Sequence, residues 1–222
     1  MRDCRVSIGT HPRSRRCVPA QNCLIGADGY LKLADFSLAK PLPCLLDIGN
    51  GRVEAVGISY TMCGSPEFMA PECVLSLGYD RTADYWAFGC LLYELFFGKN
   101  PFDHSGNLKA TFVAVASIGL GKTAISFPPE AAGTNEWGED LLQRLLVCKS
   151  RRIVSPHVFG HPFLESLDIN QLRRKEIVAP FRPVLRSSTD TSRFAMPAPE
   201  DLIEAPIIGP LEPDPFASWC GR

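Results

Sequence analysis

The chain has little net charge, no paired cysteines and no long apolar run. Its 23 lysines and arginines nearly balance 24 aspartates and glutamates, giving a formal net charge of −1 at pH 7. Without excess positive charge there is no bulk electrostatic attraction to nucleic acid or to an anionic membrane. The longest apolar stretch, "YWAFGCLLYELFFG", is shorter than the roughly 20 residues that a bilayer-spanning helix needs, and it contains Glu94. We therefore expect neither nucleic acid nor a membrane as a partner.

Cysteine spacing and the composition of the N-terminus limit the compartment and the metal chemistry. None of the nine cysteines stands in a Cys-x-x-Cys pair, and no cysteine–histidine cluster has zinc-ligand spacing. Residues 1–17 are basic but lack the apolar core of a secretory signal. The sequence therefore predicts reduced thiols and a soluble, cytoplasmic protein.

What is present indicates a folded, mainly helical domain. Apolar residues make up 45% of the chain and charged residues 21%, as in ordinary globular proteins. Helices are predicted at residues 70–78, 81–98, 106–119 and 136–148. The second of these is apolar on nearly every face, so it should lie in the centre of the domain. Thr82 is its predicted N-cap and Gly98 its predicted terminator.

One hairpin and two irregular segments complete the pattern. The stretch "CLIGADGYLKLADF" predicts two short strands joined at Asp28 and Gly29. Residues 41–60 contain prolines and glycines, and they predict a long loop. Residues 178–222 contain eight prolines, and they are predicted to run extended over a surface or to stay disordered.

The stretch "AVASIGLGKT", which ends at Thr123, looks like a phosphate-binding loop. That motif requires a glycine five residues before Gly121, where this chain has Ala116. The flanking residues also fit a helix followed by a loop. A P-loop nucleotide hydrolase is therefore disfavoured.

Three stretches, in order and with suitable spacing, resemble one family. They read "QNCLIGADGYLKLADFSLAK", "TMCGSPEFMAPE" and "DRTADYWAFGCLLYELFFGKNPF". They are similar to the C-terminal lobe of eukaryotic protein kinases of the AGC group, nearest to the cyclic-nucleotide-dependent kinases. Residues 172–194 are similar to the C-terminal extension of that group. The resemblance implies a mainly α lobe with a short β-hairpin at residues 21–163 and an extended AGC-type tail at 164–222. Residues 1–20 do not match.

The resemblance implies ATP and Mg²⁺ as cofactors. Protein kinases hold two magnesium ions through an aspartate and an asparagine, and the ions bridge the phosphates of the nucleotide. Asp35 of "ADFSLAK" and Asn22 match these two positions. Taken alone, Asn22 would be read as a turn residue at a strand edge. Phe194 matches the tail phenylalanine that closes over adenine.

The catalytic loop departs from the family pattern. Family members read His/Tyr-Arg-Asp-Leu-Lys-Pro-Glu-Asn, whereas this chain reads "RRCVPAQN", ending at Asn22. Cys17 falls on the catalytic aspartate, Pro19 on the phosphate-steering lysine and Gln21 on a glutamate that reads substrate arginine. A thiol is mostly protonated near neutral pH, so it replaces a carboxylate poorly. Ser37 is a smaller departure, because it stands where the family has a glycine.

The stretch "SYTMCGSPEFMAPE" is similar to the family's activation segment. Thr61 matches the activating phosphothreonine, and Lys40 and Arg16 match the basic residues that pair with the phosphate. Taken alone, Thr61 would be read as a solvated loop residue. Residues 41–58 make the segment longer than is usual, and we interpret part of them as an insertion or retained intron sequence.

Other matches concern the substrate. Ser65 matches the hydroxyl residue that contacts the substrate-positioning loop. Glu67 and Glu94 match the acidic pocket that binds substrate arginine, although Gln21 weakens that pocket. The expected partners are therefore protein substrates with basic motifs, together with a regulatory domain or subunit.

Three further matches concern the scaffold. Glu72 of "APE" is expected to form a buried ion pair with a downstream arginine, Arg152. Asp84 is expected to accept backbone N–H groups from the catalytic loop. A helix-start acid stabilised by the helix dipole is the alternative for Asp84, and both interpretations can hold.

Together these matches imply a serine/threonine protein kinase that uses ATP. However, no Gly-x-Gly-x-x-Gly motif and no Val-Ala-x-Lys motif precedes Gln21. Together with Cys17, this predicts little or no activity for the chain itself. We interpret residues 1–20 as foreign sequence from a truncated or mis-spliced gene. The alternatives are a non-catalytic pseudokinase module that binds substrates or regulators, and a lobe whose exposed apolar surface makes it unstable.

Overall fold

The computed structural model describes residues 13–14, 20–41, 45–47, 53–55, 57–129 and 135–194. The chain divides into two compact units, Met1–Pro183 and Val184–Arg222. The strands of the first unit are β1 (Arg13–Ser14), β2 (Cys23–Ile25), β3 (Leu31–Leu33), β4 (Lys40–Pro41), β5 (Leu45–Asp47) and β6 (Val53–Ala55). Its α-helices are α1 (Pro71–Val74), α2 (Thr82–Phe97), α3 (Leu108–Gly119), α4 (Glu136–Leu145) and α5 (Ile169–Arg174).

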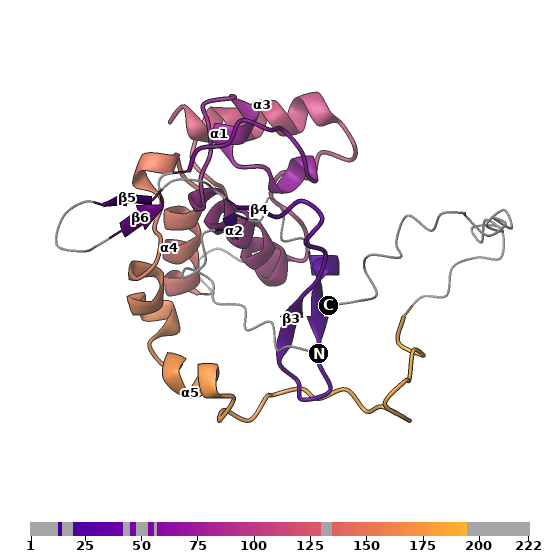
Figure 1. Cartoon of the computed structure of the whole chain (residues 1–222). Helices are drawn as coiled ribbons and strands as arrows, with labels where there is room; N and C mark the ends of the chain where they lie inside the picture. Colours follow the sequence, from indigo (N-terminus) through magenta and orange to yellow (C-terminus); the bar gives the residue numbers. More distant parts are fainter. Residues whose placement is uncertain are drawn as a thin grey trace, which may run out of the picture. The chain divides into compact units, whose positions relative to one another are not determined.

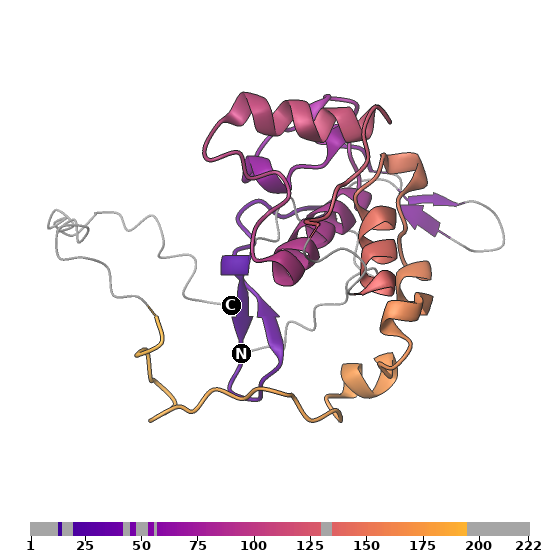
Figure 2. The same cartoon turned by 180° about the vertical axis from the view of Figure 1, so that it is seen from behind.

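Helix α2 lies at the centre of the first unit (Figures 1 and 2). Trp86 and Cys90 on this helix are completely buried, and the Trp86 ring stacks on Phe102 with ring centroids 5.2 Å apart. Because α2 is apolar on nearly every face, it can be covered on several sides at once. Helix α4 and a 3₁₀ helix at Pro66–Phe68 both pack against it. The predicted central position of this helix is confirmed.

The two ends of α2 are fixed by different devices. Gly98 ends the helix with a φ of 73°, and its N–H donates to the Glu94 carbonyl at 2.8 Å, as predicted. The predicted N-cap is wrong, because Thr82 is the first helical residue and Arg81 is the cap. Asp80 Oδ1 accepts the N–H of Thr82 at 2.8 Å. A carboxylate thus satisfies an amide that has no partner within the helix, and it suits the positive end of the helix dipole.

Helices α3 and α4 begin at asparagine caps. Asn107 Oδ1 accepts the N–H of Ala110 at 3.1 Å, and Asn135 Oδ1 accepts the N–H of Gly138 at 2.8 Å. Helix α3 packs on α1, and α4 packs on α2. Residues 114–119, the first part of the P-loop look-alike, lie inside α3. Because a true P-loop follows a strand, the preference against that motif is confirmed.

The described strands form three separate antiparallel pairs. Strand β2 pairs with β3, with Leu24 opposite Lys32, which confirms the predicted hairpin. Strand β5 pairs with β6, with Leu46 opposite Glu54. Part of the predicted loop at residues 41–60 is therefore a second hairpin. Strand β1 pairs with β4, which links a short stretch before the family resemblance to the start of that loop.

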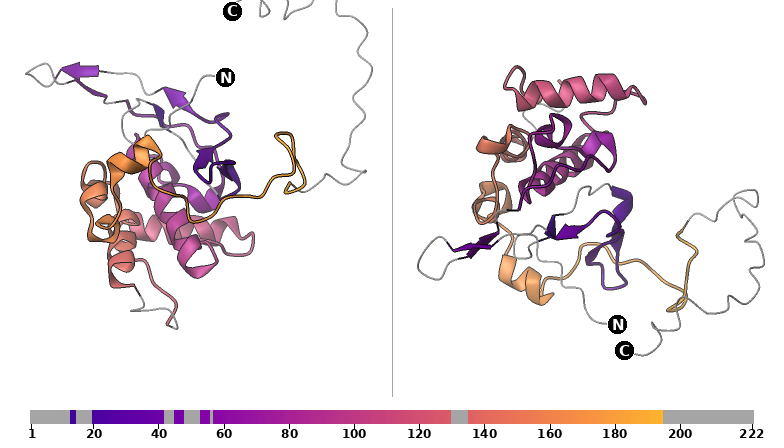
Figure 3. Two further views of the ribbon diagram at one scale, coloured as in Figure 1. Left: turned by 90° about the horizontal axis from the view of Figure 1, so that it is seen from below. Right: turned by 45° about the horizontal axis from the view of Figure 1, so that its top comes forward.

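The segment after α5 crosses the turn of the β2–β3 hairpin (Figures 1 and 3). We call residues 175–182 the strap. Lys175 Nζ donates to Asp28 Oδ2 at 2.7 Å and lies 5.4 Å from the centroid of the Tyr30 ring. The Tyr30 hydroxyl donates to the Ile177 carbonyl at 2.5 Å. The strap therefore fixes the turn end of the hairpin to the rest of the first unit.

The second unit is described over residues 184–194, where it contains neither helix nor strand. Asp190 accepts the N–H of Arg186 at 2.8 Å and that of Ser192 at 2.9 Å. These donors, Arg186 foremost, lower the pKa of Asp190 to about 2. This stretch is therefore a turn closed by one carboxylate. Over the residues that the structure covers, no helix is long and apolar enough to traverse a bilayer.

Candidate functional site

The β2–β3 hairpin brings Asn22 and Asp35 to the same end of one ladder. Asn22 ends a short 3₁₀ helix and directly precedes β2, whereas Asp35 follows β3 by two residues. The N–H of Ala34 donates to the Asn22 carbonyl at 2.8 Å, which extends the pairing beyond the strands. Antiparallel pairing therefore places an amide residue and a carboxylate residue close together.

Asp35 is exposed and has an uncommon backbone conformation. Its φ is 50°, in the left-handed region that residues other than glycine seldom adopt. Its Oδ1 accepts the hydroxyl of Ser37 at 2.6 Å and the N–H of Ser37 at 3.1 Å. The hydrogen bond from the Ser37 hydroxyl is the main cause that lowers the pKa of Asp35 below its ordinary value, and the bond from the Ser37 N–H adds to it. Asp35 therefore combines a carboxylate that favours the ionised form with a strained backbone, and strained residues of this kind cluster at functional sites.

The donor atoms of Asn22 and Asp35 fit a magnesium ion. Mg²⁺ binds carboxylate, carbonyl and water oxygens, and it commonly takes one or two protein carboxylates together with substrate phosphates. Within the described ranges, no group of three or more His, Cys, Asp or Glu side chains could hold a metal. The pair thus suits a site that a phosphate-bearing ligand completes, not a closed protein cage.

Several expected residues of the catalytic loop and activation segment lie outside the described structure. Arg16, Cys17 and Pro19 belong to residues 15–19, which the structure does not describe. Lys40 is described only as backbone, within β4. The expected roles of these residues therefore stay predictions.

The activation segment is joined to the loop before α2 just ahead of Thr61. Ser59 donates its N–H to the Tyr79 carbonyl at 2.8 Å, and Tyr79 donates its N–H to the Ser59 carbonyl at 2.9 Å. Ser59 and Tyr79 are both buried, whereas Thr61 is exposed. Thr61 therefore lies on the surface beside a fixed backbone bridge. Sequence reasoning did not identify this bridge.

Ser65 and Glu67 lie at the 3₁₀ helix that packs on α2. Ser65 is the residue that precedes this helix, and its side chain makes no capping hydrogen bond. Glu67 is half-buried in the same turn, and Glu94 is half-buried in the last part of α2. Neither glutamate side chain has a hydrogen bond or ion pair with another described residue. The acidic pocket therefore stays a prediction.

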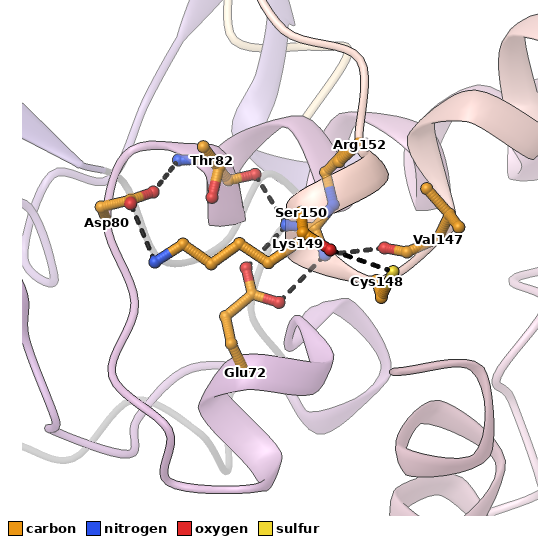
Figure 4. A network of polar contacts seen from close by, with 8 residues as sticks. All are labelled: Glu72, Asp80, Thr82, Val147, Cys148, Lys149, Ser150 and Arg152. Carbon is orange, nitrogen blue, oxygen red and sulfur yellow. Dashed lines mark hydrogen bonds and ion pairs between the residues drawn. The ribbon is translucent and has the colours of Figure 1, made fainter. Parts of the chain in front are cut away.

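The ion pair expected between Glu72 and Arg152 is present in the interior (Figure 4). Arg152 Nη1 donates to Glu72 Oε1 at 2.6 Å, and Nη2 donates to Oε2 at 2.9 Å. The same two nitrogens donate to the carbonyls of Thr82 and Val147, each at 3.0 Å. The guanidinium also lies 5.2 Å from the centroid of the Trp86 ring. One buried arginine thus joins α1 to the start of α2 and to the residues after α4.

A second ion pair lies beside the first (Figure 4). Lys149 Nζ is 2.9 Å from Asp80 Oδ2, and Asp80 also accepts the N–H of Thr82. Burial alone would raise the pKa of Asp80, but the bonds from Lys149 and Thr82 outweigh burial and lower it. Sequence reasoning missed this pair. The available signal was an aspartate two residues before the first residue of a helix.

The expected roles of Asp84 and Phe194 are not tested by the described residues. Asp84 is half-buried in the first turn of α2, and it was expected to accept backbone N–H groups from the catalytic loop, of which residues 15–19 are not described. Phe194, in the second unit, is 60% exposed, and its N–H donates to the Thr191 carbonyl at 2.9 Å. The scaffold role of Asp84 and the adenine contact of Phe194 stay predictions.

Comparison with known proteins identifies relatives over most of this sequence. Human "Ribosomal protein S6 kinase alpha-4" is 35% identical over 188 residues, which are 81% of this chain and 22% of that protein. "cGMP-dependent protein kinase egl-4" of Caenorhabditis briggsae is 28% identical over 220 residues, 92% of this chain and 25% of that protein. "Serine/threonine-protein kinase gad8" of Schizosaccharomyces pombe is 32% identical over 183 residues, 81% of this chain and 29% of that protein.

A family model also matches the central part of the chain. The chain spans about a quarter of the length of these curated relatives. The family model described as "Protein kinase domain" matches residues 16–164, which is more than half of the chain. That range contains the Asn22 and Asp35 pair as well as the buried Glu72–Arg152 ion pair. The chain therefore belongs to the protein kinase domain family.

Proposed function

We propose that this chain is part of an AGC-type serine/threonine protein kinase that transfers phosphate from ATP to hydroxyls near basic residues. The observation that carries the proposal is the placement of Asn22 and Asp35 at one end of the β2–β3 ladder. The names of the human, nematode and yeast relatives support the serine/threonine class. The nematode relative also supports a likeness to kinases that a cyclic nucleotide activates.

In this proposal Asn22 and Asp35 hold the magnesium of Mg–ATP. Held by these two residues, Mg²⁺ would neutralise the negative charge on the nucleotide during phosphate transfer. Because Asp35 is exposed, its carboxylate keeps its hydration in the free protein, and it is accessible to an ion that is bound to phosphate. The extension of the hairpin by the Ala34–Asn22 hydrogen bond keeps the two residues in register.

Thr61 is the proposed site of an activating phosphorylation. Phosphate would add nearly two negative charges to a surface residue two positions after the Ser59–Tyr79 bridge. Because the bridge fixes the backbone close to Thr61, we expect the phosphate to pair with Lys40 and Arg16 at a defined place on the surface. This role rests on the family pattern around Thr61.

Glu67 and Glu94 are the proposed readers of basic substrates. Each is half-buried, and neither has a cationic partner among the described residues. A half-buried carboxylate without a cation gains most from a substrate guanidinium, because that group forms charge-assisted, often bidentate hydrogen bonds. Protein substrates with arginine near the target hydroxyl are therefore the proposed partners.

Cys17 makes the proposed transfer slow. A positioned general base contributes about 10²- to 10⁴-fold to rate, and a protonated thiol supplies little of that. We therefore expect Cys17→Asp to raise the rate by about tenfold or more. A chain that bound peptides but never transferred phosphate would instead be the non-catalytic binding module.

Phosphate transfer from labelled ATP to an arginine-containing serine peptide tests the proposal on the whole chain. We expect Asp35→Asn to reduce transfer about a hundredfold or more, because the metal loses its charged ligand. Asp103→Asn is the matched control, since Asp103 is exposed and its Oδ1 accepts the N–H of Ser105 at 2.8 Å. Equal transfer by the two variants would refute the role of Asp35. Peptide binding without transfer, in both the wild type and Cys17→Asp, would favour the binding module.

A further inference from the structure

Ser37 stands where the family has glycine, and the hydroxyl of its side chain bonds to Asp35. The O–H donates to Asp35 Oδ1 at 2.6 Å, while the N–H of Ser37 donates to the same oxygen at 3.1 Å. A glycine at this position can make the second contact but not the first. The substitution therefore adds one charge-assisted hydrogen bond to the residue proposed to bind metal, and 2.6 Å is within the short range of such bonds.

The chain contains an internal comparison for this arrangement. Asp103 and Ser105 have the same Asp-x-Ser spacing and are both exposed. There the N–H of Ser105 donates to Asp103 Oδ1 at 2.8 Å, and the described structure has no bond from the Ser105 hydroxyl to that carboxylate. The backbone contact is therefore common to both turns. The hydroxyl contact is what distinguishes the turn at Asp35.

We propose that Ser37 is a positioning residue that commits Asp35 Oδ1 and leaves Oδ2 as the oxygen for a divalent cation. A carboxylate oxygen has two lone-pair sites, and the two donors of Ser37 fill both at Oδ1. A cation that bridged both oxygens would have to displace the hydroxyl. This inference deepens the proposed function and rests on it, because it assumes that Asp35 is a metal ligand.

The Ser37 hydroxyl is expected to lower the affinity of Asp35 for divalent cations, compared with a chain that lacks this hydroxyl. Because Asp35 and Ser37 are both exposed, water competes for the same hydrogen bonds and the penalty is modest. We expect removal of the hydroxyl to tighten cation binding by about three- to tenfold. If the hydroxyl had a purely structural role, its removal would weaken the affinity for the cation or leave it unchanged. The sign of the change therefore distinguishes the two roles.

Titration of the whole chain with Mn²⁺ alone, followed by the loss of the free Mn²⁺ electron paramagnetic resonance signal, tests the proposal. Ser37→Ala keeps the N–H and removes the hydroxyl, so it should bind Mn²⁺ more tightly. Ser37→Thr keeps a hydroxyl and should resemble the wild type. Ser105→Ala is the matched control and should change nothing. Asp35→Asn should abolish the site that these variants modulate.

The outcomes separate this inference from the proposed function. Tighter binding by Ser37→Ala, with Ser37→Thr and Ser105→Ala like the wild type, supports it. If Ser37→Ala binds no more tightly than the wild type while Asp35→Asn loses binding, the inference about Ser37 fails and the metal role of Asp35 stands. If Asp35→Asn binds Mn²⁺ as the wild type does, the metal role of Asp35 fails and the inference fails with it. If neither the wild type nor Ser37→Ala binds Mn²⁺ without nucleotide, the inference about Ser37 fails, and the transfer assay with Asp35→Asn decides the metal role.

Discussion

The Glu72–Arg152 pair and the Asn22–Asp35 pair are both polar, yet their surroundings are opposite. Arg152 and Glu72 side chains are 0% and 3% exposed, and Arg152 makes four hydrogen bonds to protein oxygens. Asp35 is exposed, and within the described residues its side-chain hydrogen bonds come from Ser37. A buried charge must find its partners within the chain, whereas an exposed carboxylate can keep an oxygen for a ligand. The first pair thus belongs to the scaffold, and the exposure of Asp35 in the second pair is compatible with the metal role proposed for it.

The two regions also differ in how they are held. Arg152 connects helices that pack around the completely buried Trp86, so its position is fixed on several sides. The β2–β3 hairpin is fixed at its turn by the strap, at the end opposite to Asn22 and Asp35. The free energy of unfolding should therefore change most for substitutions at the Glu72–Arg152 pair and less for substitutions under the strap. It should change least for substitutions at the half-buried Asp80–Lys149 pair.

Removal of the buried arginine should have the largest effect. Arg152→Ala leaves Glu72 as an uncompensated buried charge, so the free energy of unfolding should fall by about 3–5 kcal/mol. Urea unfolding at pH 7 measures this. Arg174→Ala is the control, because the Arg174–Glu176 pair has side chains 59% and 50% exposed, so solvent screens it and its removal should change the unfolding free energy little. Similar losses for both variants would erase the distinction between scaffold and surface.

A methyl group under the strap should have the next effect. Gly29 has a φ of 81°, and an added Cβ would collide with the Phe181 carbonyl and the Ala179 Cβ. Gly29→Ala should cost about 2–3 kcal/mol, from backbone strain together with displacement of the strap. Gly98→Ala has a similar φ of 73° with open space around it, so strain alone should cost about 1–2 kcal/mol. Equal losses in thermal unfolding would mean that the strap does not press on the hairpin.

The sequence predicted those parts of the fold that depend on local pattern. Helix α2 is one continuous apolar stretch that stops at a glycine. Its central position and its end at Gly98 could therefore be predicted without knowledge of distant contacts. The β2–β3 hairpin followed from turn residues between two short apolar runs. The ion pair of Glu72 with Arg152 followed from family resemblance, because 80 positions separate the two residues.

The parts that sequence reasoning missed depend on contacts between distant segments. The Ser59–Tyr79 bridge and the strap contacts to Tyr30 join segments that have no periodic pattern in common. The bond from Ser37 to Asp35 is local, but the sequence indicated only that glycine was lost, not that the hydroxyl turns toward the carboxylate. The direction of a side chain depends on the strained backbone at Asp35, which composition does not reveal.

The Asp80–Lys149 pair lies between the two extremes, since its side chains are 26% and 33% exposed. Lys149 and Thr82 hold the pKa of Asp80 below its ordinary value, despite burial. A carboxylate with a lowered folded-state pKa stabilises the protein above its unfolded pKa of about 3.9, and this stability is lost as pH falls through the folded pKa. The wild type should therefore exceed Asp80→Asn in unfolding free energy by up to about 1 kcal/mol at pH 7, and this margin should shrink as pH falls below about 4. Urea unfolding of both proteins at pH 7 and at acid pH measures the margin. A margin that stays constant or grows in acid would show that Asp80 acts through its shape and not through its charge.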